Sequence, residues 1–174
     1  MTTTAEQILR EFDTIAVVGL SRDPAKEAHS VPAGMRAAGF RIIPVNPVAE
    51  PGTTLLGETV FRSLGEAAEA GRPIDVVNVF RPSPEAAEVT REAVAAGARA
   101  VWLQEGIFSA EARALAEEAG LLYVEDECIG VVRAGLGIVK DAVDGAMGDA
   151  VDGAMGDVVD GAMGDVVDGA KGIA

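Results

Sequence analysis

Five short apolar runs, each followed by a stretch with helical spacing, restrict the fold of this chain more than any other feature of its sequence. The runs are rich in Val, Ile and Leu and do not alternate with polar residues, which is typical of strands covered on both faces. The expected strands span residues 15–18, 41–45, 75–80, 100–103 and 121–124. We therefore predict an α/β fold, a Rossmann-like three-layer sandwich around a five-stranded, mainly parallel sheet.

Polar residues mark where the expected helices begin. Thr3 with Glu6 and Ser63 with Glu66 have the spacing of a capping box, in which a hydroxyl accepts a hydrogen bond from the backbone three residues on. Ser30, Ser83 and Ser109 are the predicted caps of three further helices, and the predicted helix-ending glycines are Gly39, Gly71, Gly97 and Gly120.

Composition excludes several classes of function. The 174 residues carry a formal net charge of −14 and no run of Lys or Arg, so we expect no binding to nucleic acid. Cys128 is the only cysteine, which rules out an intrachain disulfide, and one cysteine with one histidine gives no metal-ligand spacing. The first residues do not resemble a signal peptide, and no apolar run is long enough to span a bilayer. We expect a cytoplasmic protein.

The last part of the sequence differs from the rest. Residues 141–172 form four near-identical octads, DAVDGAMG, DAVDGAMG, DVVDGAMG and DVVDGAKG. An octad advances an ideal helix about 80° beyond two turns, so the copies share no continuous apolar stripe. We predict a domain over residues 1–140 and an acidic low-complexity tail over 141–174 that is disordered or weakly helical, with a protein partner as one role for the tail.

The ends of the first two strands favour some ligands over others. Gly19 follows the first strand and precedes a hydroxyl and a cation, Ser21 and Arg22, which suits a phosphate-bearing ligand. A dinucleotide site would show Gly-x-Gly-x-x-Gly here and an acidic residue after the second strand, whereas the second strand ends in Val45-Asn46-Pro47. NAD is therefore disfavoured. The alternative is that Gly19 only permits a tight turn.

Motifs at the strand ends, taken together, resemble a known family. Val-Gly-Leu-Ser, Pro-Val-Asn-Pro, Val-Phe-Arg, Trp-Leu-Gln-Glu-Gly-Ile and Cys-Ile-Gly-Val occur in this order between Thr14 and Val132. The set is similar to that of small stand-alone CoA-binding proteins, which are themselves similar to the CoA-binding domain of the succinyl-CoA synthetase alpha subunit. This resemblance implies a Rossmann-like domain with CoA as its ligand.

The resemblance also implies which residues contact CoA. The phosphates would lie against the first loop and the following helix start, and the nucleotide beside the end of the second strand. The third strand end would flank the adenine, the fourth would form a further wall, and the fifth would approach the pantetheine. In chain order these residues are Gly19, Leu20, Ser21, Arg22, Ser30, Val31, Val45, Asn46, Pro47, Phe80, Arg81, Pro82, Gln104, Glu105, Gly106, Ile107, Cys128 and Gly130. The first loop departs from the family pattern because it contains fewer glycines and serines.

Nothing in the sequence indicates a catalyst. The related ligases carry a phosphorylated histidine in a second domain that has no counterpart here, and His29 is expected to be a surface or cap residue. We predict a non-catalytic CoA or acyl-CoA binding protein. The alternatives are an NAD(P)-binding oxidoreductase and a CoA-ligase component that requires a partner.

Overall fold

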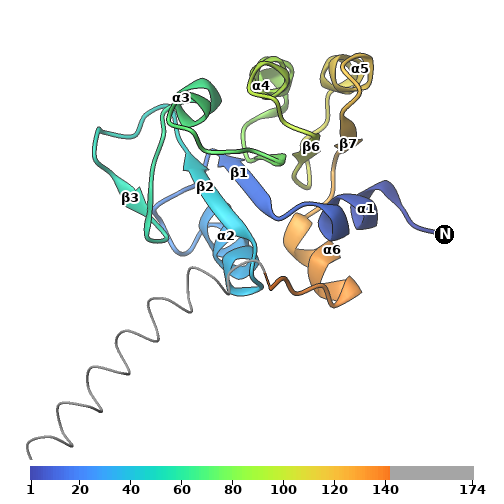
Figure 1. The fold of residues 1–174 in the computed structure, drawn as a ribbon, viewed down its shortest axis with the longest axis horizontal. Coiled ribbons are helices and arrows are strands. Elements are labelled where there is room, and N and C mark those ends of the chain that lie inside the picture. The colour runs from blue at the N-terminus through green and yellow to red at the C-terminus, as the bar shows by residue number, and fades with distance from the viewer. Residues whose placement is uncertain (142–174) are drawn as a thin grey trace, which may run out of the picture. The chain divides into compact units, whose positions relative to one another are not determined.

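A computed structural model describes residues 1–141 and shows one parallel sheet between two layers of helices (Figure 1). The sheet order is β2-β1-β5-β6-β7, and every neighbouring pair is parallel. The predicted α/β sandwich is confirmed; the predicted tail lies outside the described residues. The strands are β1 (Thr14–Val18), β2 (Arg41–Val45), β5 (Val76–Val79), β6 (Ala100–Leu103) and β7 (Leu122–Val124).

Six helices cover the two faces of the sheet within the described part of the chain. Figure 1 shows α1, α2 and α6 on one side and α3, α4 and α5 on the other. Each layer packs on its own buried apolar cluster, because successive strand residues point to opposite faces. The helices are α1 (Thr4–Glu11), α2 (Glu27–Ala37), α3 (Leu64–Glu69), α4 (Ser83–Ala95), α5 (Ala110–Glu118) and α6 (Ile129–Leu136).

Three of the predicted caps are confirmed. The hydroxyl of Thr3 accepts from the N–H of Glu6 at 3.1 Å, Ser63 caps α3, and Ser109 caps α5. The prediction for Ser83 is wrong. This residue is the first of α4, Pro82 is the N-cap, and the Ser83 hydroxyl accepts instead from the backbone N–H of Phe108 at 3.1 Å.

Ser30 is also not a cap, because α2 begins earlier than predicted. Its N-cap is Lys26, so Ser30 lies inside the helix and Pro32 is an interior residue. Proline has no N–H to donate to the carbonyl four residues back, that of Ala28. That carbonyl accepts from the N–H of Ser21 instead, at 3.1 Å. An interior proline is tolerated because the preceding loop uses the carbonyl that it leaves free.

Two features have no counterpart among the predicted elements. One is a small hairpin, β3 (Thr54–Leu55) with β4 (Glu58–Thr59), whose turn residues Leu56 and Gly57 have φ of 52° and 75°. The other is α6, which begins without a side-chain cap and contains two glycines. No helix within the described residues is long and apolar enough to cross a membrane.

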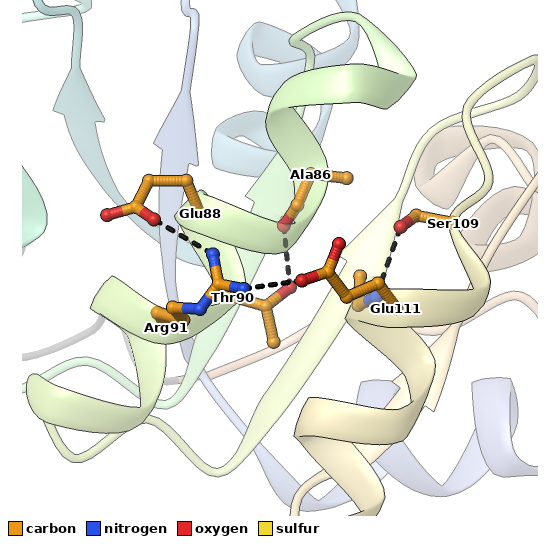
Figure 2. Close-up of polar contacts among 7 residues, drawn as sticks. Ala86, Glu88, Thr90, Arg91, Ser109 and Glu111 are labelled. Atoms are coloured by element: carbon orange, nitrogen blue, oxygen red, sulfur yellow. Dashed lines mark hydrogen bonds and ion pairs between the residues drawn. The ribbon is translucent and has the colours of Figure 1, made fainter.

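A polar bridge joins α4 to α5 on the outer surface (Figure 2). The Arg91 guanidinium donates to Glu88 on its own helix at 3.0 Å and to Glu111 on α5. Below it, the hydroxyl of Thr90 is buried and donates to the carbonyl of Ala86 at 2.8 Å. These contacts lie on the helices and not at the strand ends.

Candidate functional site

The sheet reverses its strand order between β1 and β5, so that the chain leaves these two strands in opposite directions. In open parallel sheets the ligand crevice lies beyond the carboxyl ends of the strands at this switch point. We call the region formed there by residues 19–22, 80–82, 104–107 and 128–130 the strand-end surface. It contains most of the residues that the sequence predicted to bind a ligand.

Gly19 brings the first loop against the loop after β5. Its φ is +96°, and a β-carbon on it would lie 2.9 Å from the carbonyl oxygen of Phe80 and 3.0 Å from Cδ of Arg81. Both the backbone conformation and the space therefore require glycine here. Phe80 and Arg81 are each half-buried, whereas Pro82 is exposed.

The loop after β1 already uses several of its own polar groups. The N–H of Gly19 donates to the carbonyl of Val45 at 2.8 Å, and that of Ser21 donates to Ala28. The Ser21 hydroxyl accepts from the N–H of Asp23 at 3.0 Å. It keeps its own hydrogen to donate to a ligand, and the exposed Arg22 adds a positive charge.

His29 lies beside this loop in the first turn of α2. Its Nδ1 lies 2.6 Å from the carbonyl oxygen of Ser21, an acceptor, so Nδ1 carries the proton in this contact. Ser30, the next residue, is exposed and lies farther along α2 than the prediction required. The histidine therefore fixes the position of the first loop.

The end of β2 holds the first loop in place. Asn46 donates through Nδ2 to the carbonyl of Leu20 at 3.1 Å and accepts through Oδ1 from the N–H of Val48 at 3.0 Å. Val45 and Leu20 are buried, and Pro47 is exposed. The Asn46 side chain therefore contacts two loops, and this amide occupies the place after β2 where a dinucleotide site has a carboxylate.

Three helices begin at the strand ends with an N-cap residue whose side chain makes no hydrogen bond to the helix. They are α2, α4 and α6, whereas side-chain hydroxyls cap α1, α3 and α5. Uncapped N–H groups and the positive end of the helix dipole favour an anionic ligand. The first turn of α6 also contains no acidic residue, unlike the first turns of α2 and α4.

The starts of α2 and α6 meet. A β-carbon on Gly130 would lie 3.2 Å from Cγ1 of Val31 and 3.9 Å from Sγ of Cys128. Cys128 is the N-cap of α6 and is half-buried. The structure thus brings together Val31, Cys128 and Gly130, which the sequence placed in one site from positions far apart in the chain.

Arg81 has an acidic partner. Its guanidinium contacts the carboxylate of Glu85 one turn into α4 through two hydrogen bonds, of 3.0 and 3.1 Å. The two side chains are 36% and 45% exposed, so the pair faces solvent. A phosphate that reached Arg81 would compete with Glu85 for the same donors.

The loops after β6 and β7 complete the strand-end surface. Gln104 is buried, Ile107 is half-buried, and Glu105 and Gly106 are exposed. The Trp102 indole donates to the carbonyl of Glu127 at 2.7 Å and so ties β6 to the segment that precedes α6.

Two residues of this region were absent from the prediction. Asn78, in β5, is a buried amide that donates to Gln104, and Asp126 accepts from the N–H of Gly106. The sequence could have indicated Asn78, because it is the one polar residue in the buried apolar strand Val76–Val79. For Asp126 the signal is weaker, since an acidic loop residue is common.

Two surface hollows in the described part of the chain lie away from the strand-end surface. One, of about 390 Å³, lies between α4 and α5 and includes Val94 and Leu115. The other, of about 420 Å³, lies beside β7 and includes Tyr123 and Glu125. Neither includes a predicted site residue. No three His, Cys, Asp or Glu side chains gather as metal ligands within the described residues.

Comparison with known proteins identifies close relatives. Residues 13–134 match a family model described as a CoA binding domain. Uncharacterized protein YneT of Bacillus subtilis is 39% identical over 129 residues, which are 74% of this chain and 91% of that protein.

Two solved structures have the same fold. One protein, from Thermus thermophilus, is 36% identical with a TM-score of 0.70, over 78% of this chain and 99% of its own. A hypothetical protein from Pyrococcus horikoshii OT3 is 30% identical with a TM-score of 0.69, over 77% of this chain and 92% of its own. The match covers nearly the whole of each relative.

Proposed function

The chain belongs to the CoA-binding domain family, and on this premise we propose that it is a non-catalytic protein that binds CoA or acyl-CoA at its strand-end surface. The observation that carries the proposal is the contact of Gly19 with Phe80 and Arg81 at the switch point of the sheet. It joins the first loop to the third strand end, where parallel sheets of this kind bind nucleotides.

The local groups suit an anionic ligand in spite of the acidic surface. Donors and positive charge at the strand ends come from the starts of α2 and α4, which no side chain caps, from the dipole of α6, and from Ser21, Arg22 and Arg81. Such short-range contacts can hold phosphates against a negative net charge, which acts at longer range and is screened by salt.

The non-catalytic part of the proposal rests on the two side chains that most often act as base or nucleophile. The only histidine, His29, donates to the carbonyl of Ser21, and the only cysteine, Cys128, is the half-buried N-cap of α6. Neither has a hydrogen-bonded carboxylate or base that would activate it among the described residues.

Calorimetric titration of the full chain with CoA, and separately with NADH, tests the proposal. We expect saturable CoA binding and a thermal stabilisation that grows as RT ln(1 + [L]/Kd). No heat and no stabilisation at millimolar CoA would overturn it. Saturable NADH binding without a response to CoA would instead support the oxidoreductase alternative.

We further propose that residues 1–140 bind CoA without the octads. Lys140 is held by the rest of this unit: its N–H donates to Ala38 at 2.7 Å, and Nζ donates to Arg10 at 2.8 Å and pairs with Asp13 at 3.1 Å. A chain ending at Lys140 should therefore fold and match the CoA affinity of the full chain. Loss of binding on truncation would assign the octads a part in the site, and loss of a captured protein alone would favour the partner role.

A further inference from the structure

Two buried side-chain amides lie just below the strand-end surface. Asn78 in β5 is 1% exposed, and Gln104, after β6, is 4% exposed. Nδ2 of Asn78 donates to Oε1 of Gln104 and to the carbonyl of Trp102, both at 3.2 Å. The N–H of Ile129, the first residue of α6, donates to the same Gln104 oxygen at 3.0 Å. The two amides therefore link β5, β6 and α6.

These bonds leave one atom of each amide unused. Within residues 1–141 no group donates to Oδ1 of Asn78, and none accepts from Nε2 of Gln104. The enclosed side-chain atoms that lack a partner there are others, Oε1 of Glu125 and Nε of Arg133. The two amide atoms therefore keep a contact with solvent. Leaving a mostly buried donor and acceptor unpaired costs free energy, which a ligand that pairs both would recover.

The register of the sheet shows toward which helix layer the Asn78 side chain points. Asn78 pairs with Val17 and Trp102 on the neighbouring strands, and both belong to the apolar cluster under α1, α2 and α6. Paired residues on adjacent strands point to the same face. The amides therefore open toward the layer in which Val31 of α2 meets Gly130 of α6.

This inference rests on the proposed function. We propose that Asn78 and Gln104 are specificity-determining residues that bind an amide group of the pantetheine arm of CoA. The ligand N–H donates to Oδ1 of Asn78, and the ligand carbonyl accepts from Nε2 of Gln104.

The contact also gives α6 a part in binding. Gln104 holds the first N–H of α6 with the oxygen of the same amide whose nitrogen would hold the ligand. A bound arm thus fixes the side chain that accepts from the first N–H of α6. Polar networks of this kind act as a unit, so changing Gln104 should weaken the contact of Asn78 with the arm as well as its own.

Gln104→Glu tests the assignment in the full chain. The carboxylate keeps an oxygen for Asn78 and Ile129 but replaces the spare N–H donor with a second acceptor. Two ligands are titrated by calorimetry: CoA, and adenosine 3′-phosphate 5′-diphosphate, which is CoA without the arm. We expect the variant to bind CoA at least tenfold more weakly than wild type, relative to its binding of the arm-free ligand. Its affinity for the arm-free ligand should stay within twofold of wild type.

Two further variants keep the result interpretable. Thr90→Val removes a different buried hydrogen bond, on α4, and should leave both affinities unchanged (Figure 2). Should Gln104→Glu fail to fold, Gln104→Met replaces it with a side chain of similar length and should give the same relative loss of CoA affinity.

Three results would overturn the inference. Unchanged CoA affinity would mean that the amides hold only water, and an equal loss for both ligands would place the adenosine end there. If the wild-type chain bound no CoA at all, the proposed function itself would fail, which the wild-type titration shows separately.

Discussion

Asp126 accepts a hydrogen bond of 2.7 Å from the backbone N–H of Gly106 while its own backbone lies in the left-handed region, at φ 58°. The contact joins the loop after β7 to the loop after β6. A second bond, from the N–H of Asp126 to the carbonyl of Ile107 at 3.1 Å, runs between the same loops. One residue therefore fixes how two parts of the strand-end surface lie against each other.

Replacing Asp126 should separate its two contributions. Asp126→Ala loses the side-chain acceptor and puts in the left-handed region a residue that tolerates it less well than Asp, so we expect the free energy of unfolding to fall by about 1–3 kcal/mol. Asp126→Asn keeps an acceptor and tolerates this backbone, and should cost about 0.5 kcal/mol or less. Urea denaturation measures both. Equal losses for Ala and Asn would contradict this account of the loop.

Two glycines of the chain should respond to alanine in opposite ways. Gly19→Ala meets the Phe80 carbonyl and requires φ +96°, so it should lower the free energy of unfolding by about 2 kcal/mol or more. Gly34→Ala is the matched control, because Gly34 lies inside α2 and a β-carbon added there would meet nothing within 4 Å, and it should raise the free energy by about 0.5–1 kcal/mol. Thermal melts of both variants check the signs.

The ion pair of Arg81 with Glu85 should weaken ligand binding. Glu85→Gln releases the Arg81 guanidinium and removes a negative charge, so CoA should bind about two- to fivefold more tightly, an effect that shrinks at high salt. The control is Glu88→Gln on the same helix, whose partner is Arg91 on the outer surface (Figure 2). Calorimetry at two salt concentrations measures the change. Weaker binding by Glu85→Gln would show that the carboxylate itself holds the ligand.

Tyr123 should make the fold sensitive to alkali. Burial, and then the neighbouring Glu125 carboxylate, raises the pKa of its hydroxyl, which donates its one hydrogen to the carbonyl of Ser109 at 3.2 Å. The folded chain therefore keeps this proton above pH about 10, where the unfolded chain loses it. Stability is full below that pH and falls as the pH rises toward the folded value.

Tyr123→Phe isolates this effect from the titration of lysines. We expect the variant to be less stable than wild type near neutral pH, because it lacks the bond to Ser109, and to lose less stability between pH 9 and 11, a range chosen around the ordinary tyrosine pKa of about 10. Denaturant midpoints across that range give the comparison. Parallel curves for the two proteins would refute the assigned role.

The sequence was sufficient where local rules decide the structure. Buried parallel strands need apolar runs, and β2 and β6 have the predicted bounds, 41–45 and 100–103. Thr3, Ser63 and Ser109 cap helices because their hydroxyls reach the backbone three residues on. The residues within such a segment are enough to predict where the strand or helix begins and ends.

Elsewhere the structure depends on contacts between distant residues. The prediction that Ser30 caps a helix was wrong. The helix begins earlier and includes Pro32, because the N–H of Ser21 donates to the carbonyl that this proline leaves free. The start of α6 was not foreseen because the acceptor for its first N–H is Gln104, 25 residues away in the chain. Asn78 was passed over because its partners lie on the next strand. Such pairings appear only once the sheet order is known.

Trp102 makes the strand-end surface optically accessible. It is the only tryptophan of the chain, it is fully buried, its indole is bonded to the carbonyl of Glu127, and its own carbonyl accepts from Asn78. When the excitation wavelength is too long for Tyr123 to absorb, the emission therefore comes from a single fluorophore that touches both the segment before α6 and the buried amides. Its wavelength and lifetime would report occupancy of this one place without any attached label.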